Sequence, residues 1–196
     1  MDVRKYILTM DKTAVFIDNG YFKKVQDEFN VRVDYLRFVE YICGESSERF
    51  RTYVYDCPPY QSNPPTEEEI KKKSNFDSYK YNISKLPRFE FRMGRLQIIR
   101  DKEGRKITES DGTPVLKQKG VDMALGIDVA RLSTTRQIQK IIIIAGDSDF
   151  VPAIIAAKQE GILVTLYYYN KVHDSLYDVC DDRIELTRDM FEKCKR

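Results

Sequence analysis

Short apolar runs alternate with helical patterns along most of the chain. Residues 13–18, TAVFID, form an apolar run, and residues 51–56, RTYVYD, form a second run that is rich in β-branched and aromatic side chains. Between them, residues 34–43 carry apolar side chains at helical spacing behind Asp34, a residue type that favours a helix N-cap. The pattern therefore predicts strand, helix and strand in this order.

The middle of the chain combines one long helical pattern with a ribbon. Thr66 and Glu69 have the spacing of a capping box, which predicts a helix start at this point. From residue 88 to 116, polar and apolar residues alternate around glycine-containing turns. This alternation predicts a strand that runs into a β-hairpin over about residues 96–118, and we expect the hairpin to project from the core.

The last third of the chain returns to alternating strands and helices. Strands interleaved with helices are typical of a parallel sheet that is covered by helices on both faces. A length of 196 residues fits one domain, so we expect a single α/β domain over residues 1–196. The predicted helices lie near 120–133, 149–160 and 173–180, and the predicted strands near 140–145, 162–168 and 183–187.

Charge is distributed unevenly along the chain. The net charge is only +2, but residues 71–120 hold fourteen Lys or Arg against six Asp or Glu, a local balance of +8. The remainder therefore carries −6. A basic middle beside an acidic frame suits a polyanionic partner, although solvated helix faces also collect lysines without any partner.

The cysteines and the hydropathy pattern limit the choice of class and compartment. The four cysteines lie far apart, and one histidine, His173, is too little to build a zinc site with them. We interpret them as reduced thiols. The chain has no apolar run of about 18 residues and no signal peptide pattern, which predicts a cytoplasmic protein without membrane contact.

Carboxylates follow two of the predicted strands. Asp18 ends the first apolar run, and Asp147 follows the isoleucine run in IIIIAGDSDF, residues 141–150. In open parallel sheets, ligands bind beyond the carboxyl ends of the strands, and two carboxylates there repel each other unless a cation intervenes. Oxygen ligands with almost no histidine favour Mg²⁺ or Mn²⁺ over zinc. The alternative is that Asp147 or Ser148 only caps the following helix.

Two further acids lie on the helix predicted near residues 120–133. Asp122 shares an apolar face with residues three and seven positions further on, and Asp128 lies on another largely apolar arc. Carboxylates in such places need partners. The partner is either a bound cation or a structural salt bridge with Lys119 or an arginine.

Three motifs in this order resemble the NYN domain, a branch of the PIN-like ribonucleases. They are Asp18-Asn19 at the first strand end, KGVD at 119–122, and GDSDF at 146–150, and the resemblance covers about residues 13–187. It implies a three-layer α/β/α fold with a mostly parallel sheet. The predicted ribbon is longer than we expect for the minimal family domain.

The resemblance also assigns roles to individual residues. It places the metal-binding acids of the family on Asp18, Asp122 and Asp147, with Asp149 close by. A late acidic position of the family falls on Asp181, with the adjacent Asp182 as the alternative.

The implied activity is metal-dependent hydrolysis of RNA phosphodiester bonds. Carboxylate-bound metal ions can activate water, stabilise the phosphate and neutralise the leaving oxygen without histidine. In this interpretation Asp149 completes the metal shell or orients the nucleophile, and Asn19 contacts a phosphate or a metal-bound water. Lys119 stabilises developing charge or is only a solvated lysine, and Asp56 at the end of the second strand is an additional candidate.

We expect RNA to approach over the basic middle of the chain. Aromatic residues are interleaved with the basic ones there, so charges for phosphates and rings for bases occur together. An inactive RNA-binding or protein-interaction module of the same fold is the alternative, and a homo-oligomer is left open. The predicted RNA-binding residues are Lys71, Lys72, Lys73, Arg88, Arg92 and Arg95.

Overall fold

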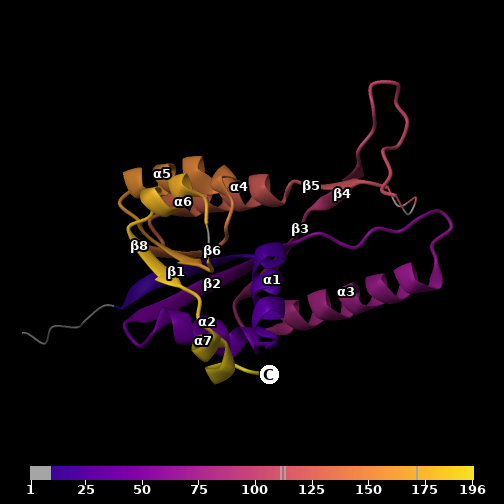
Figure 1. Ribbon diagram of the computed structural model, residues 1–196. Helices are drawn as coiled ribbons and strands as arrows, with labels where there is room; N and C mark the ends of the chain where they lie inside the picture. Colours follow the sequence, from indigo (N-terminus) through magenta and orange to yellow (C-terminus); the bar gives the residue numbers. More distant parts are fainter. Residues whose placement is uncertain (1–9, 111, 113, 171) are drawn as a thin grey trace, which may run out of the picture.

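Six parallel strands form the centre of the molecule in the computed structural model, which describes residues 10–110, 112, 114–170 and 172–196. The strand order is β3-β2-β1-β6-β7-β8, so β1 lies next to β6 although more than 120 residues separate them (Figure 1). This pairing brings the carboxyl ends of β1 and β6 together. The strands are β1 (Asp11–Asp18), β2 (Ser47–Asp56), β3 (Phe89–Met93), β6 (Lys140–Ile144), β7 (Leu163–Tyr168) and β8 (Asp182–Glu185).

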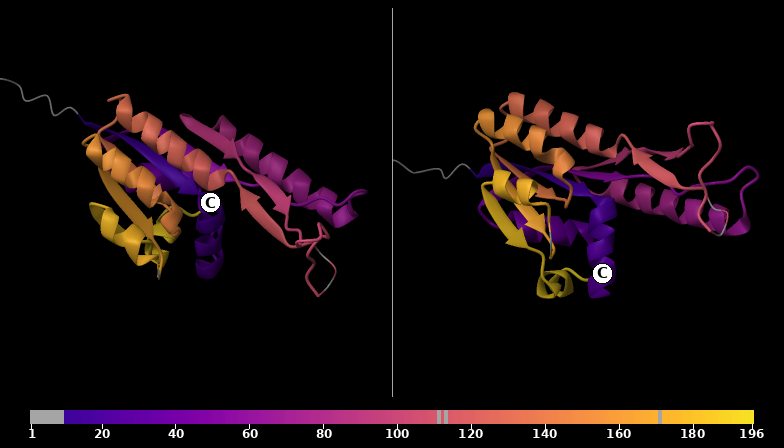
Figure 2. Two further views of the ribbon diagram at one scale, coloured as in Figure 1. Left: turned by 90° about the horizontal axis from the view of Figure 1, so that it is seen from above. Right: turned by 45° about the horizontal axis from the view of Figure 1, so that its top comes forward.

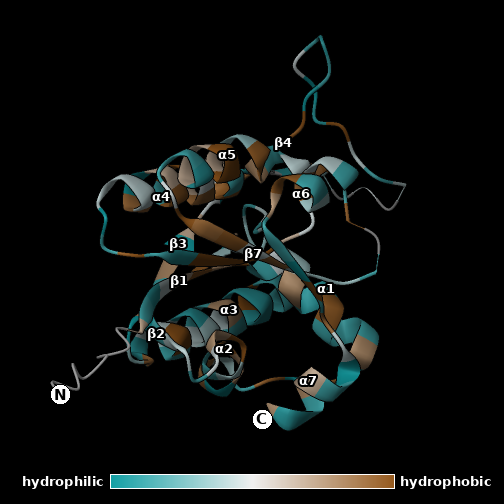
Figure 3. Ribbon diagram, turned by 90° about the vertical axis from the view of Figure 1, so that its left-hand side faces the viewer, coloured by the Kyte–Doolittle hydropathy of each residue, from teal (hydrophilic) through white to brown (hydrophobic). Residues whose placement is uncertain are grey.

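The isoleucine run of β6 is buried on both faces of the sheet. Ile141 and Ile143 belong to one core cluster, and Ile142 and Ile144 belong to the other. Neighbouring side chains of a strand point to opposite faces, so a strand covered on both sides needs a continuous apolar run. Figure 3 shows the apolar strands of the sheet between two layers of helices.

Helices cover both faces, which confirms the predicted three-layer α/β/α architecture. One layer consists of α4 (Val121–Thr134), α5 (Val151–Gln159) and α6 (Asp174–Val179). The other consists of α1 (Asn19–Phe29), α2 (Tyr35–Cys43) and α7 (Arg188–Lys193), with part of α3 (Glu67–Lys85). None of the helices among the described residues has the length and apolar character to cross a membrane.

Two elements project from the same side of the sheet. Figures 1 and 2 show α3 and the antiparallel pair β4 (Arg95–Ile98) and β5 (Leu116–Lys119) extending beyond β3. The predicted hairpin is therefore confirmed. Backbone hydrogen bonds between Ile99 and Val115 and between Val115 and Ile107 continue it beyond the two strands.

Most predicted element boundaries are confirmed, with a few differences. Asp34 caps α2 by accepting a bond from the backbone N–H of Arg37 (2.9 Å), and the capping box of Thr66 and Glu69 begins α3. The helix predicted over 149–160 is a short 3-10 turn, η1 (Ser148–Phe150), followed by α5. All four cysteines are free and buried, as expected.

Candidate active site

Asp18 stands where β1 ends and α1 begins. Its side chain accepts a hydrogen bond from the backbone N–H of Tyr21 (3.2 Å) and so caps α1. Burial raises the pKa of Asp18 to about 6, and the nearby negative charge of Asp122 adds to this rise. The carboxylate of Asp18 is therefore held, at neutral pH, in a place that disfavours its charge.

Asp122, Asp147 and Asp149 add negative charge near Asp18, at the edge of the sheet where the strands have their carboxyl ends. Asp122 is half-buried in the first turn of α4, and its pKa is raised by burial and then by the charges of Asp147 and Asp149. Asp147 caps η1 by accepting a bond from the backbone N–H of Asp149 (3.1 Å). Asp18 and Asp147 thus both cap helices, yet Asp122 caps nothing, and each acid has oxygen atoms that remain free for a ligand.

No cation forms an ion pair with these four acids within the part of the chain that the structure describes, and Lys117 only partly offsets the rise in the pKa of Asp122. Asp18, Asp122, Asp147 and Asp149 all lack a basic side chain within 4.0 Å. Nearby acids do have such partners, because Asp56 pairs with Lys23 and Asp128 with Arg92. We refer to the four unpaired residues as the acid cluster.

The donor chemistry of the acid cluster fits a divalent metal, although the ligands are not gathered around one point. Among the described residues, no three His, Cys, Asp or Glu side chains are close enough together to hold a metal ion. The cluster offers only carboxylate oxygens, which Mg²⁺ and Mn²⁺ prefer, and its charge is uncompensated. Binding a cation therefore requires the exposed Asp147 and Asp149 side chains to turn toward Asp122 and Asp18.

Asn19 belongs to a buried polar network. Its amide donates to Asp56 Oδ2 (2.6 Å), and its carbonyl oxygen accepts bonds from the hydroxyls of Tyr35 (2.5 Å) and Tyr79 (3.0 Å). Lys23 Nζ lies 2.7 Å from the same Asp56 oxygen. Asn19 therefore ties α1 to β2. Its side chain has no exposed surface with which to contact a phosphate or a metal-bound water.

Asp128 is a structural acid. Its Oδ2 accepts bonds from Tyr55 Oη (2.8 Å) and Arg92 Nε (3.1 Å), while Arg131 lies 3.4 Å from Oδ1. Of the alternatives left open by the sequence, the salt bridge with an arginine is therefore correct for Asp128. Only six positions separate Asp122 from Asp128 on α4, yet only Asp128 has an arginine partner.

Two predicted site residues lie at the opposite edge of the sheet. Asp181 precedes β8, where it accepts a bond from the backbone N–H of Val164 (2.9 Å) and pairs with Lys158 (2.8 Å). Arg88 precedes β3 and donates to the backbone oxygen of Arg49 (2.6 Å). Because the acid cluster follows the carboxyl ends of parallel strands, the structure does not bring Asp181 or Arg88 to it, and Asp182, the first residue of β8, lies at that same distant edge.

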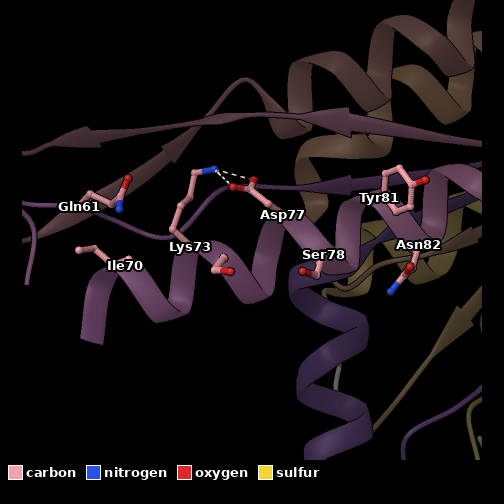
Figure 4. Close-up of a pocket in the computed structure, with 8 residues that line it drawn as sticks. Gln61, Ile70, Lys73, Asp77, Ser78, Tyr81 and Asn82 are labelled. Carbon is pink, nitrogen blue, oxygen red and sulfur yellow. Dashed lines mark hydrogen bonds and ion pairs between the residues drawn. The ribbon is translucent and has the colours of Figure 1, made fainter. Parts of the chain in front are cut away.

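The other predicted residues remain near the projecting elements. Lys71, Lys72 and Lys73 lie on α3, beside an open hollow of about 750 Å³. Figure 4 shows Lys73 and its partner Asp77 among the residues that line this hollow. Arg92 is engaged by Asp128 and Glu90. Arg95 begins β4 and Lys119 ends β5, so both lie on the β4–β5 ribbon. Ser148 begins η1 directly after Asp147 and is half-buried.

Tyr21 is a residue that the sequence interpretation missed. Its hydroxyl accepts a bond from the backbone N–H of Tyr169 (2.8 Å), and its ring packs so closely on Gly146 that a Cβ there would lie 2.5 Å from it. Tyr21 thereby holds the chain between β6 and Asp147 against the start of α1. The signal in the sequence was Gly146, which a close approach requires.

Comparisons with known proteins agree with this architecture. The family model of the NYN domain matches residues 12–187. The crystal structure of a protein of unknown function, VPA0982 from Vibrio parahaemolyticus RIMD 2210633, is similar in fold, with a TM-score of 0.59 and 19% sequence identity. The similarity covers 93% of this chain and 96% of that chain. No curated protein matches this chain.

Proposed function

Because this chain belongs to the NYN domain family, whose members are generally nuclease-like, we propose that it is a metal-dependent ribonuclease. The observation that carries the proposal is the acid cluster, four carboxylates at one edge of the sheet without a cation among the described residues. Unpaired negative charge destabilises a fold, so a site that retains it is suited to bind a cation that the chain itself does not supply.

Asp18, Asp122 and Asp147 would hold Mg²⁺ or Mn²⁺ directly or through water, and Asp149 would complete the shell or orient the attacking water. The metal, when bound, would supply an activated water and neutralise charge on the phosphate and the leaving oxygen. The helix cap fixes one of the carboxylates, since Asp18 is held by the backbone N–H of Tyr21. A fixed ligand limits the loss of conformational entropy on binding.

The alternative is an RNA-binding or protein-interaction module that has lost turnover. The absence of a preassembled ligand set among the described residues is the observation that favours it. The exposed positions of Asp147 and Asp149 favour the enzyme, because these side chains can still move toward a cation.

The test uses a fluorescent RNA incubated with the wild-type protein and Mn²⁺, with and without excess EDTA. Cleavage that EDTA abolishes supports the ribonuclease, and the matched variant Asp147→Asn, which keeps the cap on η1, should lose it. Tight binding without cleavage under all metal conditions would support the binding module instead.

A further inference from the structure

The β4–β5 ribbon carries a face of basic side chains. The antiparallel register places Arg95 opposite Lys119 and Gln97 opposite Lys117, so these four residues share one face. Each of the four is exposed. Arg95 and Lys119 put like charges directly opposite each other, an arrangement that destabilises an isolated ribbon and that a bound anion would relieve.

Within the described residues, no carboxylate forms an ion pair with this face, and Lys117 acts on Asp122 only from beyond 4.0 Å. Neither β4 nor β5 contains an acid, and none of Arg95, Lys117 and Lys119 has an acidic side chain within 4.0 Å. The lysines of α3 differ, since Lys72 pairs with Glu68 and Lys73 with Asp77. The ribbon is thus a stronger candidate for phosphate contacts than α3.

The base of the ribbon is fixed beside the acid cluster. The backbone N–H of Gly94 bonds to the carbonyl oxygen of Asp56 (3.0 Å), and a Cβ on Gly94 would lie 2.5 to 2.9 Å from Val121, Cys57 and Lys119. Such close packing leaves the ribbon little freedom at this point. Lys119 also precedes Asp122, in the first turn of α4, by only three positions.

A trough runs along the ribbon and mixes apolar and basic residues. Its volume is about 820 Å³, and its lining combines the half-buried Leu96, Ile98 and Ile99 with Arg100, Lys117 and Lys119. Lys117 and Lys119 are about 6.6 Å apart along one strand, which is the scale of the distance between successive phosphates. On β4, Leu96 and Ile98 alternate with Arg95 and Gln97, so the apolar side chains lie on the opposite face and the trough reaches both faces of the ribbon. It therefore offers phosphate contacts on the basic face and apolar contacts for bases on the other.

We propose that the basic face of the β4–β5 ribbon binds the single-stranded RNA segment next to the cleaved bond and guides it to the acid cluster. This inference rests on the proposed ribonuclease function. A duplex presents mainly phosphates and sugars to a protein, whereas an unpaired strand can also place its bases on apolar side chains. The aliphatic lining of the trough therefore favours the single strand over the duplex.

The test measures RNA binding in EDTA, so that cleavage does not affect the result. The ribbon variant Arg95→Gln/Lys117→Gln/Lys119→Gln uses the residue that Gln97 already provides on this face. By fluorescence anisotropy with a labelled single-stranded oligouridylate, we expect it to bind about tenfold more weakly or worse. The slope of log K against log salt should fall by about 2, since each lost phosphate contact of a single strand contributes about 0.7.

The matched control is Lys71→Gln/Lys72→Gln/Lys73→Gln on α3, which removes the same charge and should change the slope less. A melting temperature no lower than that of the wild type would show that the ribbon variant is folded, and Lys117→Arg/Lys119→Arg should retain binding. Unchanged affinity and slope in the ribbon variant would overturn the inference. Equal or tighter wild-type binding to a duplex would overturn the preference for a single strand.

The same samples keep this inference separate from the proposed function. If the wild type cleaves RNA in Mn²⁺ while the ribbon variant binds RNA as the wild type does, the ribonuclease stands and the ribbon inference fails. If the ribbon variant alone loses binding while the wild type never cleaves, the ribbon inference stands without the nuclease.

Discussion

Two groups of buried or half-buried aspartates lie near each other in this molecule, and only one of them is neutralised. Asp56 and Asp128 are almost fully enclosed, and each has a cation and additional hydrogen bonds from neighbouring side chains. Asp18 and Asp122 have burial and like charges but no ion-pair partner among the described residues.

The difference shows how to separate scaffold from chemistry in this fold. A buried carboxylate with a partner contributes to the native state because loss of its charge leaves the partner unsatisfied. A carboxylate without a partner opposes folding, so its retention points to a ligand. Substitutions of single aspartates test this contrast, and a substitution of the α3 lysines tests the same rule for basic residues.

The largest expected effect is on RNA cleavage. In Asp18→Asn, Asp122→Asn or Asp147→Asn, loss of a metal-binding oxygen should remove several kcal/mol of transition-state stabilisation, which is about a thousandfold in rate. Melting temperatures measured with and without Mn²⁺ should show a metal-induced rise for the wild type only. Full cleavage by all three variants would place these residues in the scaffold.

The second prediction concerns the pH dependence of stability through Asp18. Its folded pKa of about 6 exceeds the unfolded value of 3.8, so folding favours the protonated carboxyl. The contribution of Asp18 is therefore fully present below about pH 4 and declines as the pH rises through 6. At pH 7 this cost reaches up to about 3 kcal/mol, and Asp18→Asn, which keeps the cap, should remove it.

The measurement is chemical denaturation of the metal-free wild type and of Asp18→Asn from pH 4 to pH 7.5. The free energies of unfolding should diverge as the pH increases, with the variant more stable. Parallel curves would mean that the carboxylate of Asp18 is not held in a low-dielectric place.

The third prediction addresses the neutralised group. Asp128→Asn removes the charge that holds Arg92 and Arg131 while the side chain keeps its size. We expect a loss of about 2 to 3 kcal/mol in the free energy of unfolding, with metal-dependent cleavage per folded molecule unchanged. Destabilisation of this variant beside stabilisation of Asp18→Asn would be the sharpest form of the contrast.

The sequence predicted the layers well because hydrophobic period and caps are local. The isoleucine run, the cap at Asp34 and the capping box at Thr66 each need only neighbouring residues, and all agree with the structure. Two helices, α1 and α7, were not placed. Helix α7 has only six residues, too few to show a period.

The candidate site was harder to predict because pairing depends on residues far away in the chain. Asp122 and Asp128 look alike in sequence, but only Asp128 meets Arg92, which comes from β3. Asp181, the late acidic position that the resemblance implies, precedes β8 and so lies away from the acid cluster, because the two ends of β8 lie at opposite edges of the sheet.

The smallest expected effect comes from the lysines of α3. The sequence predicts that Lys71, Lys72 and Lys73 contact RNA, but the first turn of α3 holds three glutamates, and Asp77 lies one turn after Lys73. This charge balance is near zero, so Lys71→Gln/Lys72→Gln/Lys73→Gln should lower the salt slope of single-stranded RNA binding by no more than about 0.7, one phosphate contact. The measurement is the anisotropy titration in EDTA at several salt concentrations. A loss as large as that of the ribbon variant would make α3 an equal part of the binding surface, because unpaired charge would then no longer distinguish the residues that bind RNA.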